Sequence, residues 1–439
     1  MVMDTVNINY LDDEVGAVSF DTATGIGQFE YHKKFIRQGL ELAPLTMPLS
    51  DQIYSFPAID PAAFKGLPGM VADSLPDDFG NAVLNSWVAR QGKSPADITP
   101  LERLRYTGKR GMGALTFAPA IQQKGLNASQ HIAIQSLVDI AQNILNDRAN
   151  FEVSIKQDSQ ENTDAMMALM SVGMSAGGAR PKAVLAFNDD FTDVRSGQVD
   201  VPLGFSHYLL KFDGVNEKNT QQETFGDPQG YGTMEYSYYQ MATACGIDMM
   251  PCHLLNEGRR RHFITQRFDR IGNERVHIQT LNALTHTSYK RPGEFSYEAL
   301  FATARQLGLT PAEAKQLFRR MAFNIIARNH DDHSKNFAFC MDKNGQWRLS
   351  PAYDIAYSYA QGNKWIDIHW MALNNKRDNF DRKDFYALTE VSPIFTRKFI
   401  DEVIEETTNS VSNWRTIASN NEVPHALIDT IEKNLRLKI

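Results

Sequence analysis

The chain contains little cysteine, and that scarcity removes one class of protein at the outset. Three cysteines occur in 439 residues, and no two of them form a CxxC pair. A disulfide framework is therefore excluded, and we interpret the three thiols as buried packing residues.

Long apolar runs and a targeting segment are also missing. No apolar run approaches the roughly 20 residues of a membrane-spanning helix. The chain opens with the acidic MVMDTVNINYLDDE rather than a basic and then apolar signal, so we expect a cytoplasmic protein. The net charge of −7 gives no general attraction to nucleic acid. The length and the 42% hydrophobic content predict a sizeable core divided over two or three units.

The richest chemistry lies in residues 324–339, NIIARNHDDHSKNFAF. Four residues separate Asp331 from Asn336, which is the interval that protein kinases use in their catalytic loop. Phosphoryl transfer needs a carboxylate to accept the proton of the attacking hydroxyl and a neutral oxygen to bind Mg²⁺. Lys335 would place a cation near the transferred phosphate. Asp354, in LSPAYDIAY, is the best candidate for a second metal ligand.

Two alternatives concern this same segment. His330 and His333, beside two aspartates, also resemble a metal-dependent phosphohydrolase site, although that interpretation needs further ligands elsewhere in the chain. Asp332 adjoins Asp331, so the catalytic base could be assigned one position too early. Only Asp331 has the kinase interval to Asn336.

A glycine-rich segment, SVGMSAGGARPK at residues 171–182, precedes the strand-like AVLAF. Backbone N–H groups in such a turn approach phosphate oxygens closely, because glycine has no Cβ. Gly173, Gly177 and Gly178 are candidates for this contact, although a plain hairpin turn explains the pattern equally well. Residues 148–164, which follow a helix expected near residues 128–147, are interpreted as a polar connection.

A second cation is expected inside the fold. HYLLKF at residues 207–212 has the pattern of a buried strand, and a buried lysine is costly unless it meets an anion. Lys211 is therefore the candidate for binding the nucleotide phosphates, with the alternative that it lies in solvent on an edge strand. Glu235, early in the helix expected at residues 232–246, could pair with it or serve only as a favourable N-terminal charge.

The remaining pattern divides the chain into a β-rich half before residues 324–339 and a helical half around and after them. FITQRFDR at residues 263–270 reads as a strand followed by a turn, where a kinase hinge would place Gln266 and Phe268. Residues 103–117 predict a turn into a strand, and residues 76–90 an amphipathic helix. The fold class expected is α+β, a two-lobed kinase-like architecture.

Five motifs, SAGGARPK, YLLKF, FITQRFDR, NHDDHSKN and LSPAYD, occur in the order found in a known family. The chain resembles the HipA-like serine/threonine kinases, the toxins of bacterial type II toxin–antitoxin systems. The resemblance implies an N-terminal subdomain (1–120), a kinase N-lobe (121–290) and a helical C-lobe (291–439). It also implies site roles: Asp331 and Lys335 in catalysis, Asn336 and Asp354 on Mg²⁺, Lys211, Lys182, Gly177, Gly178, Gln266, Phe268 and His333 on ATP, and Ser175 as an autophosphorylated residue.

The same resemblance implies partners. These would be a helix-turn-helix antitoxin, operator DNA reached through that antitoxin, and a protein substrate of the translation machinery such as an aminoacyl-tRNA synthetase. Two other functions stay open at this point. A similar site could phosphorylate a small-molecule hydroxyl, or the chain could be an inactive scaffold that only binds a repressor.

Overall fold

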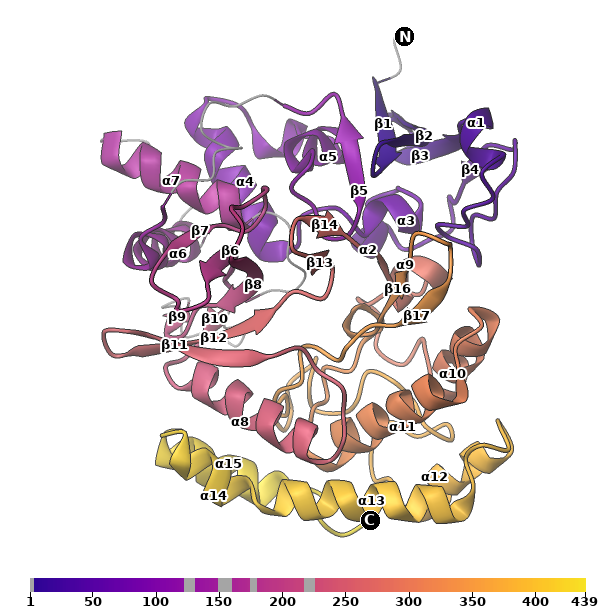
Figure 1. The fold of residues 1–439 in the computed structure, drawn as a ribbon, viewed down its shortest axis with the longest axis vertical. Helices are drawn as coiled ribbons and strands as arrows, with labels where there is room; N and C mark the ends of the chain where they lie inside the picture. Colours follow the sequence, from indigo (N-terminus) through magenta and orange to yellow (C-terminus); the bar gives the residue numbers. More distant parts are fainter. Residues whose placement is uncertain (1–3, 122–130, 149–159, 174–179, 217–225) are drawn as a thin grey trace.

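The computed structural model describes residues 4–121, 131–148, 160–173, 180–216 and 226–439 (Figure 1). Within those ranges no helix combines the length and the apolar character that crossing a membrane requires.

The N-terminal part is built on an antiparallel sheet with the strand order β4-β3-β2-β1-β5. In β1 (Asp4–Tyr10) the buried residues Val6, Ile8 and Tyr10 alternate with more exposed ones, which is the period of a strand with one covered face. The other strands are β2 (Asp13–Asp21), β3 (Ile26–Tyr31), β4 (Tyr54–Ser55) and β5 (Leu115–Ala118). The helices of this part are α1 (Lys33–Ile36), α2 (Pro61–Phe64), α3 (Gly69–Ala72), α5 (Pro100–Thr107) and the 3-10 turn η1 (Pro95–Asp97).

A second antiparallel sheet, ordered β11-β12-β8-β6-β7, forms the centre of the molecule. Its strands are β6 (Lys182–Asn188), β7 (Val194–Ser196), β8 (Phe205–Lys211), β11 (Cys252–Glu257) and β12 (Arg260–Gln266). Three helices, α4 (Asp78–Arg90), α6 (Ile134–Arg148) and α7 (Gln160–Gly173), share one apolar core with β6 and β8. Helix α8 (Tyr231–Ala244) contacts β11 and β12 and joins the core of the helical half. The short pair β9–β10 (Val215–Asn216, Gly226–Asp227) lies between β8 and β11 in the sequence, and the pair β13–β14 (Arg270–Ile271, Glu274–Arg275) follows β12.

The C-terminal part is mainly helical, and α11 (Pro311–Ile326) is its central helix. A capping box at Thr310 and Glu313, with Pro311 in the first turn, starts this helix. It packs on α10 (Tyr297–Gln306) and α13 (Arg397–Ser412), and α13 also contacts α8 (Figure 1). The other elements are α9 (Leu281–Thr285), α12 (Arg382–Tyr386), η3 (Ala387–Thr389), α14 (Trp414–Asn420), α15 (His425–Asn434) and the sheet β15-β16-β17 (His277–Thr280, Ala338–Met341, Trp347–Leu349).

The structure corrects three expectations about secondary structure. Residues 160–164, interpreted as connection, begin helix α7, which continues to Gly173; its C-terminal half buries Met166, Leu169 and Met170 at helical spacing. Gly173 therefore ends a helix rather than opening the glycine-rich turn. Residues 103–107, expected to belong to a turn into a strand, lie in helix α5 (Pro100–Thr107), which begins at a capping box on Thr99. The division of the chain at residues 120 and 290 stays a prediction.

Candidate active site

The candidate catalytic loop begins where α11 ends. Asn329 donates its backbone N–H to the Asn324 carbonyl over 2.9 Å, which closes the helix in the manner of a Schellman motif. Arg328 occupies the left-handed position of that motif, with φ of 59°. The chain then runs through Asp331 and Asp332 into the short turn η2 (Ser334–Asn336) and the strand β16.

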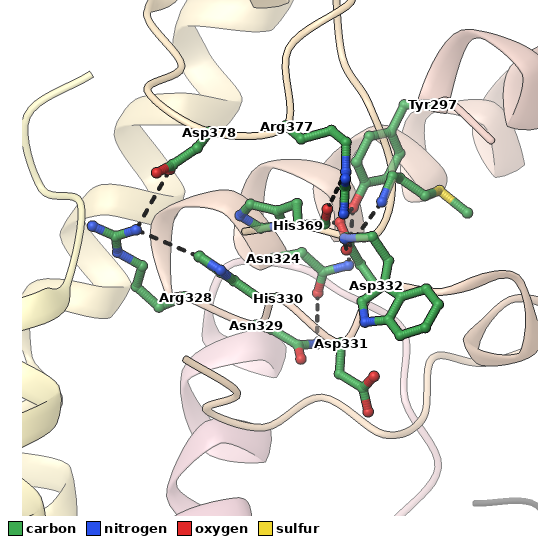
Figure 2. A network of polar contacts seen from close by, with 12 residues as sticks. Tyr297, Asn324, Arg328, Asn329, His330, Asp331, Asp332, His369, Arg377 and Asp378 are labelled. Atoms are coloured by element: carbon green, nitrogen blue, oxygen red, sulfur yellow. Dashed lines mark hydrogen bonds and ion pairs between the residues drawn. The ribbon is translucent and has the colours of Figure 1, made fainter. Parts of the chain in front are cut away.

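The two adjacent aspartates have opposite surroundings. The Asp331 side chain is 43% exposed, and its nearest ionisable partner is His333 Nε2 at 3.6 Å. The Asp332 side chain is fully buried. In Figure 2 the Asp331 carboxylate points away from the polar network that surrounds Asp332. Asn336 donates its side-chain N–H to the Asp331 carbonyl over 2.7 Å, so the two ends of the predicted motif are joined directly.

Asp332 anchors the loop from within. Its carboxylate accepts hydrogen bonds from the Tyr297 hydroxyl at 2.6 Å and from His369 Nδ1 at 2.9 Å. It also accepts the backbone N–H groups of Trp370 and Met371 at 2.8 and 3.3 Å. Burial raises the pKa of Asp332 to about 6, against the lowering effect of the Tyr297 hydrogen bond. All its acceptor capacity is used to fix the loop, which leaves Asp331 as the carboxylate open to a substrate.

His330 is buried as well, and it faces the same network rather than solvent. Its ring lies 4.0 Å from that of His369, and burial together with His369 lowers the pKa of His330 to about 2. Across the described ranges no group of three or more His, Cys, Asp or Glu side chains is arranged to hold a metal ion. The phosphohydrolase alternative therefore finds no ligand set among those residues.

Lys211 lies on β8, between β6 and β12, and its side chain is 5% exposed. The interpretation of an exposed edge-strand lysine is therefore wrong, and the expected pairing with Glu235 of α8 is confirmed at 2.5 Å. Lys211 also forms an ion pair with Asp354. Burial lowers the pKa of Lys211, but Asp354 and Glu235 outweigh it, so that the pKa is raised overall.

Asp354 connects this lysine to the catalytic loop. Its backbone is left-handed, with φ of 54°, and its side chain is 31% exposed. Burial raises its pKa, but the cations of Lys211 and Lys182 bring the pKa well below the ordinary value. A small cavity is lined by both Asp354 and Asn336. The expected pair of metal ligands thus shares one cavity, and carboxylate and amide oxygens are donors that Mg²⁺ accepts.

The two other candidate lysines lie near acidic groups of the N-terminal part. Lys182 stands opposite Lys211 in the β6–β8 register and approaches Asp77 Oδ2 at 3.5 Å. Burial raises the pKa of Asp77 to about 6, although Lys182 opposes this. Lys335 is half-buried, with its ammonium 4.7 Å from the centre of the Tyr289 ring.

The predicted hinge residues lie at the end of β12. Gln266 is the last residue of that strand, and its N–H donates to the Pro251 carbonyl. The Phe268 ring lies 5.7 Å from that of Tyr353, next to Asp354. The structure thus brings Phe268 close to the segment that contains Asp354. Ser175, Gly177 and Gly178 lie outside the described residues.

Four residues that support the site were missed by the sequence analysis: Tyr297, His369, Arg436 and Asp77. The first three surround Asp332 and His330, and Asp77 meets Lys182. They lie 35 to 105 positions from their partners, and no local pattern marks such a contact.

Comparison with known proteins identifies the fold. Residues 6–118 match the family described as HipA N-terminal domain, and residues 174–414 match HipA-like C-terminal domain. The serine/threonine-protein kinase toxin HipA of Shewanella oneidensis is 22% identical over 414 residues, which cover 87% of this chain and 81% of that protein. The protein Y4mE of Sinorhizobium fredii is 28% identical over 141 residues, 29% of this chain but only 33% of that relative.

A solved structure agrees over nearly the whole length. The Shewanella oneidensis structure of HipA, HipB and operator DNA matches with a TM-score of 0.65 and 16% identity, covering 98% of this chain and 95% of that one. This likeness confirms the two-lobed α+β fold with an N-terminal subdomain. The match to the HipA-like C-terminal domain covers more than half of the residues of this chain, so the chain belongs to the HipA-like family.

Proposed function

We propose that this protein is an ATP-dependent serine/threonine kinase that acts as the toxin of a bacterial toxin–antitoxin pair. The observation that carries the proposal is the meeting of Lys211, Glu235 and Asp354 beside the loop of Asp331. A kinase needs a lysine for the nucleotide phosphates, a helix carboxylate that holds it, and a second carboxylate for the metal. The name of the Shewanella oneidensis relative supports the same reaction class.

Asp331 serves as the general base. Its partly exposed carboxylate can accept the proton of a substrate hydroxyl. The buried Asp332 fixes the loop backbone to which the Asp331 side chain is attached. The Asn336 side chain donates a hydrogen bond to the Asp331 carbonyl. The proposed base and Asn336, the proposed metal ligand, are therefore held in fixed positions relative to each other. Lys335, in the same loop, supplies a cation near the transferred group.

Lys211 and Lys182 bind the nucleotide phosphates, with Gly177, Gly178 and His333 as further contacts and Gln266 and Phe268 at the adenine. Asn336 and Asp354 would hold Mg²⁺, which neutralises phosphate charge when bound. Because Asp354 stays ionised to low pH beside two lysines, it can supply a metal ligand at any physiological pH. Ser175 is the site of autophosphorylation, which would bring about −1.5 to −2 charges into a site built for anions.

A helix-turn-helix antitoxin is the proposed partner, and operator DNA would be bound through it. The Shewanella oneidensis structure contains HipA together with HipB and operator DNA, and a chain of net charge −7 needs such an adaptor to meet DNA. The proposed substrate is a component of translation, such as an aminoacyl-tRNA synthetase.

The decisive experiment incubates the protein with γ-labelled ATP, Mg²⁺ and a bacterial lysate, followed by mass spectrometry. Label on seryl or threonyl residues of a protein, absent with Asp331→Asn, supports the proposal. Label found only in small molecules would show a small-molecule kinase instead. No transfer at all, with antitoxin binding retained, would show an inactive scaffold.

A further inference from the structure

The last residue of helix α15 and the residues that follow it, 434–439, lie against the back of the catalytic loop. Arg436 donates its backbone N–H to the Ile326 carbonyl at the end of α11, over 2.9 Å. The Asn434 carbonyl accepts from Arg328 Nε at 2.6 Å, and the Asn434 amide reaches the Tyr357 hydroxyl at 2.8 Å. The segment thus contacts both the end of α11 and the first residue of the loop.

The Arg436 side chain extends this contact into the buried network. It is 10% exposed, and its guanidinium lies over the Phe380 ring at 5.5 Å. Nη1 is 3.2 Å from His369 Nε2, and Nη2 forms an ion pair with Asp378. Asp378 also lies 3.7 Å from Arg328 Nη1 (Figure 2). The same carboxylate therefore contacts both Arg436 and the first residue of the loop.

The protonation of His369 follows from these contacts. Burial, then Arg436 and Arg328, hold the pKa of His369 well below its usual range, so the ring is neutral. A neutral ring has one donor and one acceptor nitrogen. Nδ1–H therefore donates to Asp332, and Nε2 accepts from Arg436. Arg436 thereby fixes the tautomer that Asp332 needs.

The backbone conformation of Arg328 is a second indication that the contact between residues 434–439 and the loop is needed. The left-handed position at a helix end is usually occupied by glycine, because a side chain there is strained. An arginine remains there when its side chain is held by other groups. Here the holders are the Asn434 carbonyl, Asp378 and the Tyr359 ring, 4.5 Å from the guanidinium carbon.

We propose that residues 434–439 are a positioning element for phosphoryl transfer, with Arg436 as the positioning residue that acts through His369 and Asp332 on Asp331. Arg436 contacts His369, Asp378 and the Phe380 ring, so its effect on Asp331 is indirect. Its effect is to keep the loop backbone in the geometry in which the Asp331 carboxylate meets the acceptor hydroxyl. The inference rests on the proposed kinase function, because it concerns the step in which Asp331 takes part.

The test compares Arg436→Met, which keeps the aliphatic stem, with Arg436→Lys, which restores a cation for Asp378. Steady-state kinase assays should show kcat lowered by about ten- to a hundredfold in Arg436→Met, since small misplacements of catalytic groups cost that much. KM for ATP should stay near the wild-type value, and Arg436→Lys should recover part of kcat. Arg415→Met is the matched control, because Arg415, like Arg436, forms an ion pair with a carboxylate but lies exposed on α14.

A second readout does not depend on activity. Amide hydrogen exchange should rise in the peptide covering residues 327–337 of Arg436→Met and remain unchanged there in Arg415→Met. If Arg436→Met does not yield folded protein, Asp378→Asn, which removes the carboxylate shared by both arginines, should show the same pair of effects. Unchanged exchange in the loop, or a loss of kcat matched by a proportional rise in KM, would overturn the inference. Wild-type protein without kinase activity would reject the proposed function, whereas the exchange measurement would still decide this inference.

Discussion

Replacing Asp331 and Asp332 by asparagine, one at a time, tests which of the two carboxylates takes part in catalysis and which one holds the loop in place. Asp331→Asn removes a proton acceptor from a side chain that is 43% exposed and lies 3.6 Å from His333 Nε2. Its free energy of unfolding should change by no more than about 0.5 kcal/mol. Phosphoryl transfer should fall by about 10²- to 10⁴-fold, the usual contribution of a general base, with ATP affinity retained.

Asp332→Asn should behave in the opposite way. An asparagine can accept at only one of the two carboxylate positions. If its NH₂ group replaces Oδ1, it faces the backbone N–H groups of Trp370 and Met371; if it replaces Oδ2, it faces His369 Nδ1–H. Either choice leaves a buried donor without an acceptor, at about 1–3 kcal/mol. Because burial already raises the Asp332 pKa to about 6, removing the charge offsets part of this cost, and we expect a net loss at the lower end of that range, about 1 kcal/mol.

Denaturant unfolding and single-turnover kinase assays measure the two effects on the same preparations. The reasoning is refuted if Asp331→Asn keeps full activity while Asp332→Asn is stable and inactive. That pattern would shift the catalytic base by one position. A loss of activity in Asp332→Asn that is matched by loss of folded protein agrees with the assignment.

Three other predictions address the nucleotide site and the contact between the N-terminal and helical parts. Lys211→Met should lower ATP affinity and leave Glu235 buried without its cation; unchanged ATP binding by calorimetry would show that this lysine does not hold phosphates. Ser175→Ala should gain no phosphate on its glycine-rich peptide in intact-mass measurements, whereas the wild type should gain one and lose activity. Burial lowers the pKa of His286 to about 4, so stability should fall as pH drops from about 6.5 toward 4, where only the unfolded chain takes up the proton. His286→Gln, which can still accept the Gly69 N–H, should show a weaker pH dependence of thermal unfolding.

The features that local sequence could predict are those with a local physical cause. The Asp331–Asn336 interval lies within one turn of chain, and the structure joins its ends by a hydrogen bond. The buried lysine of β8 was predictable because an unpaired ammonium in an apolar strand is costly, so an anion had to be near. Helix α4 was predictable from its acidic N-terminus and apolar spacing, and it runs from Asp78 to Arg90.

The features that escaped prediction depend on tertiary packing. Tyr297 and His369 contact Asp332 from segments 35 and 37 residues away, and neither lies in a pattern that marks it as a ligand of a carboxylate. Helix α7 was missed as a whole, because residues 160–164 are polar, Gly173 was assigned to the glycine-rich turn, and the apolar face of the helix appears only from Met166 onward. Asp77 caps helix α4 by accepting the Gly80 N–H, but its second contact, with Lys182, depends on the packing of α4 near β6 and leaves no local signal in the sequence.

Two strained residues mark the places where local preference and the needs of the site disagree. Arg328 and Asp354 are both left-handed, with φ of 59° and 54°, a conformation that costs a residue with a side chain about 1 kcal/mol or more. Glycine at either position would relieve the strain but would delete the guanidinium that meets Asn434 or the carboxylate that meets Lys211. The strain is compatible with the fold because both side chains are held in place, that of Arg328 by Asn434, Asp378 and the Tyr359 ring and that of Asp354 by Lys211. Substituting glycine at Arg328 therefore separates the backbone strain from the side-chain contact. A more stable but slower enzyme would show that the contact between Arg328 and Asn434 serves catalysis. A less stable protein would show that this contact serves folding.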